Sequence, residues 1–204
     1  MARIVVRPAL PIVIVLSLSL SAGCAGLLGS PYDRANGYVS EANGAIDEHN
    51  RLFENARDTY DEAKQSVEVG ESTSGESTSG EATSQGAERI ARAREDRQEA
   101  RDKLEEAREP LSEVQDLEVE DEIKEYTGLL TEAVDAQLAA EDQEIRFYEL
   151  LEEDPRLSEN RDDAEALLTE VGDGYQEARD AYDRAQEVAD ANPDLLPDEN
   201  GASR

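Results

Sequence analysis

The sequence is poor in the residue types from which most catalytic and metal centres are built. Its 204 residues include one cysteine, one histidine, one methionine and no tryptophan. A single cysteine cannot form a disulfide within the chain. A single histidine excludes a site with several histidine ligands, and no Glu-x-x-His pair of the di-iron type is present. With no phosphate-binding loop either, the sequence predicts a protein that is not an enzyme and holds no metal or non-covalent cofactor.

Positive charge is also scarce. The chain has 50 acidic residues against 20 Lys and Arg, which gives a formal net charge of −30. Such a charge repels phosphate backbones and anionic headgroups, so nucleic-acid binding is excluded. Of the 20 basic residues, only 3 are lysines. This acid-rich, lysine-poor composition resembles that of proteins from salt-loving archaea, which implies a fold whose surface repulsion is screened in molar salt.

The first 24 residues differ from the rest of the chain. Two arginines precede an almost wholly apolar run over 9–20, and the small residues Ala22 and Gly23 then precede Cys24. This arrangement resembles the signal of prokaryotic, and given the composition haloarchaeal, lipoproteins. Ser21 departs from the pattern, in which leucine is commoner. The resemblance implies cleavage before Cys24, a thioether-linked lipid on that cysteine, and anchoring at the extracytoplasmic face of the cytoplasmic membrane.

Two other interpretations of this segment stay open. Cys24 could be a buried residue behind an ordinary secretory signal, or the apolar run could remain as an uncleaved anchor. The run is shorter than the roughly 20 residues that a membrane-spanning helix needs, and Pro8 and Pro11 interrupt its start. The cleaved lipoprotein signal is therefore favoured.

The composition changes along the chain indicate its organisation. We expect a signal peptide at 1–23, a tether at 24–31, a first helix at 32–67, and a disordered linker at 68–86. Three more helices are expected within 87–191, followed by a disordered tail at 192–204. The linker repeats Gly-Glu-Ser-Thr-Ser and has too few apolar residues to bury a core, although its Ser/Thr density also suits an O-glycosylated stalk. Pro110 is expected to kink or restart the second helix.

The helical segments carry heptad patterns in which one seam position is usually alanine. Spacings alternate four and three, as in coiled coils. The sequences ARDTYDEA, ARDKLEEA and ARDAYDRA, which begin at Ala56, Ala100 and Ala178, repeat the scheme. Alanine once per heptad allows close helix approach. Similar helix lengths and short breaks predict an all-α, elongated, antiparallel up-down four-helix bundle. An extended coiled coil that pairs between molecules is the alternative.

Several seam positions are polar, and three of them lie at one height. Counting 1.5 Å per residue from the helix ends places His49, Arg97 and Gln137 about 26–28 Å along the bundle, with Tyr175 at about 24 Å. Glu144 is a further polar seam position. The predicted polar layer either fixes the register of the helices or forms a pocket for a small ligand or anion.

Together these features predict a membrane-anchored cell-envelope lipoprotein with a structural or protein-interaction role and an envelope protein as its partner. The alternative is a small-ligand-binding lipoprotein that serves a membrane transporter through the polar layer. A pocket beside Arg97 would favour the ligand. A continuous exposed apolar stripe on the helix at 119–153 would favour a protein partner.

Overall fold

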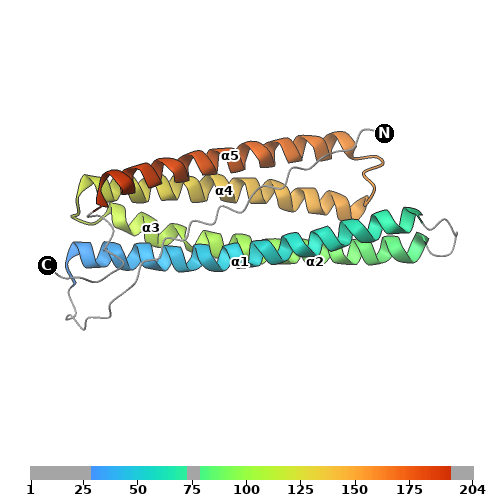
Figure 1. Cartoon of the computed structure of the whole chain (residues 1–204), viewed down its shortest axis with the longest axis horizontal. Coiled ribbons are helices and arrows are strands. Elements are labelled where there is room, and N and C mark those ends of the chain that lie inside the picture. The colour runs from blue at the N-terminus through green and yellow to red at the C-terminus, as the bar shows by residue number, and fades with distance from the viewer. Residues whose placement is uncertain (1–28, 73–78, 194–204) are drawn as a thin grey trace.

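The computed structural model describes residues 29–72 and 79–193, and within these ranges the regular elements are all α-helices. The elements are α1 (Pro31–Ser72), α2 (Ser79–Glu106), α3 (Arg108–Gln115), α4 (Asp121–Glu153) and α5 (Arg161–Ala191). The long helices alternate in direction, with α1 and α2 in one hairpin and α4 and α5 in another (Figure 1). At 1.5 Å per residue, α1 is about 63 Å long, so the predicted elongated all-α bundle is confirmed.

The two hairpins pack together mainly through α2 and α4, and α3 follows α2 along the same interface. Arginines of α2 and α3 form ion pairs with carboxylates of α4, which runs antiparallel to them. The pairs are Arg94–Glu152 (2.5 Å), Arg101–Asp142 (2.9 Å) and Arg108–Asp135 (2.5 Å). All three pairs are partly exposed, so each contributes little to stability. The three pairs nevertheless follow one register: as the arginine position advances along α2 and α3, its partner moves back along α4, as antiparallel packing requires.

α1 begins with a reciprocal cap. The Asp33 backbone N–H donates to Ser30 Oγ (3.1 Å), and the Ser30 backbone N–H donates to Asp33 Oδ2 (3.0 Å). Pro31 occupies the first helical position, where its missing N–H costs nothing. This is a capping box with aspartate in place of the usual glutamate, and it gives α1 a defined first turn.

The expected restart near Pro110 lies between α2 and α3. α2 ends at Glu106 and α3 begins at Arg108. Pro110 has no N–H to donate to the Glu106 carbonyl, and its ring clashes with that same carbonyl. A continuous helix is therefore interrupted there. Pro110 itself is buried, as are Leu111 and Val114, so α3 still contributes to the core.

The first two helices extend further than the sequence indicated. α1 continues to Ser72 and α2 starts at Ser79, whereas a disordered linker was expected over 68–86. Extending an existing helix adds one backbone hydrogen bond per residue fixed, and this gain outweighs the low apolar content of the segment. Residues 73–78 lie outside the described residues. So do the expected signal peptide, the tether as far as residue 28 and the tail beyond Pro193.

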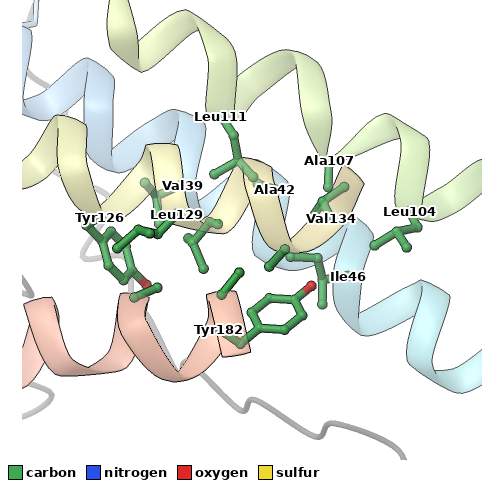
Figure 2. Close-up of a cluster of buried hydrophobic side chains, with 14 of the residues drawn as sticks. Val39, Ala42, Ile46, Leu104, Ala107, Leu111, Tyr126, Leu129, Val134 and Tyr182 are labelled. Atoms are coloured by element: carbon green, nitrogen blue, oxygen red, sulfur yellow. The ribbon is translucent and has the colours of Figure 1, made fainter. Parts of the chain in front are cut away.

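The alanine seams are buried, as the heptads predict. The following seam alanines are each at most 1 % exposed: Ala35, Ala42, Ala56, Ala63, Ala93, Ala100, Ala107, Ala164, Ala178 and Ala185. Figure 2 shows the largest cluster, in which Ile46, Leu104, Leu129 and Tyr182 converge from four different helices. Small residues thus bring the helix axes together while large side chains fill the space beside them.

α4 and α5 approach each other closely at Gly174. A Cβ atom placed on Gly174 would lie 2.9 Å from the Cβ and 3.3 Å from the Cα of Ala140. Real Cβ atoms do not approach this closely, so the contact requires glycine. Tyr175, the next residue, is thereby held against α4.

Candidate functional site

A group of polar side chains is buried midway along the bundle, between the two hairpins. We call it the polar cluster. It contains His49 (α1), Arg97 (α2), Gln137, Glu141, Glu144 and Tyr148 (α4), and Tyr175 and Tyr182 (α5). His49, Arg97 and Glu141 are 1 %, 2 % and 0 % exposed. Burial of this many ionisable groups is costly unless they satisfy one another.

One half of the polar cluster is centred on Glu141. Its Oε1 lies 2.7 Å from Nε2 of His49 and accepts a hydrogen bond from Nε2 of Gln137 at 3.2 Å. The Tyr182 hydroxyl donates to Oε1 of Gln137 at 3.3 Å. A chain of contacts therefore joins α1, α4 and α5.

The other half is centred on Glu144. Nη2 of Arg97 donates to Oε1 of Glu144 at 2.5 Å, and the Tyr175 hydroxyl donates to Oε2 at 2.8 Å. The Tyr148 hydroxyl donates to Oε1 at 3.3 Å. The guanidinium carbon of Arg97 lies 3.5 Å from the ring centroid of Phe53. This cation–π contact holds the buried guanidinium between an aromatic face and a carboxylate.

Burial keeps the cluster tyrosines protonated. Desolvation, reinforced by the nearby Glu144 carboxylate, raises the pKa of Tyr148 and Tyr175 well above the usual value. Desolvation and Glu141 do the same to the pKa of Tyr182. Burial alone would lower the pKa of Arg97, but Glu144 and its neighbours raise it overall, so the guanidinium stays charged. The hydroxyls are thus donors and the arginine a permanent cation.

Three buried atoms of the cluster have no hydrogen-bond partner among the described residues: Nε and Nη1 of Arg97 and Oε2 of Glu141.

A surface groove of about 410 Å³ lies elsewhere, between α4 and α5, and Arg146, Leu150 and Leu167 are among its lining residues. The cluster does not border this groove. The side chains of the polar cluster bind mainly one another, and this arrangement is suited to fixing how the helices align.

The sequence-predicted site residues meet in two groups. His49 lies beside Gln137, with Nε2 atoms 3.3 Å apart, whereas Arg97 and Tyr175 share the Glu144 carboxylate. The predicted lipid attachment site, Cys24, lies outside the described residues.

Sequence reasoning missed Glu141, because carboxylates in so acidic a chain were assigned to the solvated surface. The spacing of apolar residues on α4 nevertheless indicates that position 141 is buried. Val134, Leu138, Ile145 and Tyr148 form a second stripe on α4, and position 141 completes its alternating four-three spacing. A carboxylate at a stripe position is a candidate for burial with a cationic partner.

Across residues 29–72 and 79–193, no three His, Cys, Asp or Glu side chains are grouped to hold a metal ion. No helix in that part of the chain combines the length and apolarity needed to cross a membrane. Comparison with known proteins gave no match to a protein family, a curated protein or a solved structure.

Proposed function

We propose that this protein is a lipid-anchored lipoprotein whose helical rod has a structural or protein-interaction role in the cell envelope. The proposed anchor is Cys24, and the proposed location is the extracytoplasmic face of the cytoplasmic membrane. α1 begins at Pro31, only seven residues after Cys24. A rod that starts this close to a lipid would stand on the membrane with little intervening chain.

The observation that carries a structural role is the mutual pairing within the polar cluster. The four residues named as a possible ligand site are each engaged by a neighbouring side chain, with His49 on Glu141 and Arg97 on Glu144. Residues that bind one another to align two hairpins support a scaffold more directly than a receptor. A small-ligand role at this height has in its favour the buried Nε and Nη1 atoms of Arg97, which have no hydrogen-bond partner among the described residues.

The exposed surface of the bundle indicates what kind of protein partner would bind to it. Both apolar stripes of α4 are buried, for example Leu130 at 2 %, Val134 at 0 % and Tyr148 at 2 % exposure. A protein partner would therefore meet the acidic outer surface, and the net charge of −30 favours a partner with a basic face.

Replacing the proposed lipid-bearing residue tests the anchor. We expect Cys24→Ser to move the full-length protein from the membrane fraction to the soluble fraction, because no thiol remains to receive lipid. Ser21→Ala, a small-residue change three positions earlier, is the matched control and should leave the protein in the membrane fraction. Intact-mass spectrometry of the wild-type protein should give a chain that begins at Cys24 and carries the added mass of lipid.

Two results would contradict the proposal. One is a wild-type mass that matches the unmodified chain with its leader attached. The other is a Cys24→Ser protein that still partitions fully with membranes. The interaction role has its own test, which is in-cell cross-linking from exposed acidic positions: partners with a basic face support it, and a protein that cross-links to nothing counts against it.

A further inference from the structure

The surface groove between α4 and α5 is lined by one stripe of residues from each helix. α4 contributes positions 146, 149, 150 and 153, and α5 contributes positions 163, 166, 167 and 170. Each set has the spacing i, i+3, i+4 and i+7, which follows one face of a helix over two turns. Because α4 and α5 are antiparallel, the two stripes lie side by side for roughly 10 Å, and a third helix can pack along such a groove.

The apolar residues of the groove are Leu150, Ala166 and Leu167. The two leucines are partly exposed and pack against the buried cluster that contains Phe147 and Leu151. Ala166 is exposed. A small residue between larger ones allows the backbone of an incoming helix to approach closely, while the leucines offer it apolar surface.

The other lining residues are charged and exposed, and most of them are acidic. They are Arg146, Glu149, Glu153, Asp163 and Glu170. Among the residues that the structure describes, none of these four carboxylates forms an ion pair. The apolar strip is therefore bordered by negative charge that is available to a partner.

The connection between α4 and α5 holds this end of the groove in a fixed shape. The Asp154 carboxylate accepts hydrogen bonds from the backbone N–H groups of Arg156 (3.3 Å) and Glu159 (2.9 Å). Leu157 has a φ of 49°, in the left-handed region that leucine rarely adopts, and it packs against the same cluster as the two groove leucines. Such strain persists where the surroundings fix it, and it is concentrated at functional sites. A groove that is already formed also lowers the ordering cost of binding.

We propose that this groove binds an amphipathic helix of a partner protein, with an apolar face that enters the groove and with Lys or Arg on both borders of that face. Charge complementarity identifies the occupant, because basic side chains at the borders would meet the exposed carboxylates. A second copy of this chain does not fit, since its net charge is −30 and paired grooves would bring carboxylates together. This assignment rests on the proposed interaction role and adds to it a site and a class of partner.

The groove also lies at a suitable place on the rod. α1 begins at Pro31, and the connection between α4 and α5 lies at the opposite end of the bundle (Figure 1). With the proposed anchor at Cys24, the groove would be held away from the membrane surface, where a partner can reach it.

Two synthetic peptides test the chemistry of the occupant. Each has about 18 residues, or roughly 27 Å of helix, with leucine along one face, and the borders of that face carry lysine in one peptide and glutamate in the other. We expect the full-length protein to bind the lysine peptide at least about tenfold more tightly than the glutamate peptide, as measured by fluorescence anisotropy. The measurement is made in 1 M KCl, where a screening length of about 3 Å removes long-range attraction to the acidic chain and leaves contact pairs.

A bulky side chain in the groove tests where the peptide binds. Ala166→Trp fills the groove from an exposed position and should weaken binding of the lysine peptide at least about tenfold. Gln186→Trp is the matched control, because it adds the same ring at an exposed position of α5 outside the groove. Both variants should keep the helical circular dichroism of the wild type.

Charge reversal tests the borders of the groove. Glu153→Lys combined with Asp163→Lys should weaken binding of the lysine peptide about threefold or more. Asp183→Lys combined with Glu187→Lys changes the net charge equally at exposed positions outside the groove, and should leave binding nearly unchanged.

Four results would overturn this assignment. They are a lysine peptide that does not bind at about 1 mM, equal binding of the two peptides, equal weakening by a groove variant and its control, and a dimer of the full-length protein that Ala166→Trp dissociates. Photo-cross-linking in cells separates this assignment from the interaction role. Cross-links from acidic positions elsewhere but none from position 166 would refute the groove alone, and cross-links from neither would count against both.

Discussion

Replacing Gly174 with alanine tests how closely α4 and α5 are packed. The new methyl would meet Ala140 Cβ at 2.9 Å and Ala140 Cα at 3.3 Å, and neither atom belongs to a flexible side chain that could move aside. The helices would have to separate. Overpacking of this kind costs about 1–3 kcal/mol, against a gain of about 1 kcal/mol from replacing glycine within a helix.

Gly172 provides the matched control, because it lies two residues earlier on α5 and a methyl added there would meet no neighbouring atom within 4 Å. We expect Gly172→Ala to raise the free energy of unfolding by up to about 1 kcal/mol, and Gly174→Ala to lower it by about 1 kcal/mol. Urea unfolding followed by circular dichroism measures both. If the two substitutions stabilise the protein equally, the close approach of α4 and α5 is refuted.

Two further predictions concern buried polar groups. Arg97→Leu should lower the free energy of unfolding by about 3 kcal/mol, because Glu144 loses its cation, and adding Glu144→Gln should recover much of this loss. Equal urea midpoints for Arg97→Leu and the double variant would show that the loss in Arg97→Leu does not come from an unpaired Glu144 charge. The second prediction is alkaline unfolding. Desolvation raises the pKa of Tyr60 and Tyr126 to about 12. A raised pKa means that stability is intact below about pH 10 and falls as the pH rises towards 12. Tyrosinate absorbance and loss of helical circular dichroism should therefore change together, and full ionisation of the tyrosines with helices intact would contradict their burial.

The fold was predictable because its main determinant is a repeated spacing. Alanine and a large apolar residue alternate at four and three residues, and this pattern identifies which face of each helix is buried without knowledge of its neighbours. Short connections then leave antiparallel packing as the simplest arrangement. The Pro110 break was predictable for an equally local reason, the missing N–H.

The features that sequence reasoning missed depend on neighbouring helices. Glu141 has the same side chain as many exposed glutamates, and only the position of His49 on another helix identifies it as a buried partner. The helical ends at Ser72 and Ser79 were missed because residue composition describes the isolated segment, whereas propagation from an existing helix decides its state. The contact of Gly174 with Ala140 was also beyond sequence reasoning, because it joins two helices and appears only in three dimensions.

The division into two hairpins also implies an order of assembly. Contacts within each hairpin join neighbouring helices, whereas the His49–Glu141 contact joins residues 92 apart in the chain. Closing short loops before long ones is entropically favoured, so each hairpin would form early and the two would dock last. Interactions made after the rate-limiting barrier act on unfolding and leave folding almost unchanged. The central polar contacts would then govern how long the finished rod persists, while the alanine-lined hairpins govern how quickly it appears.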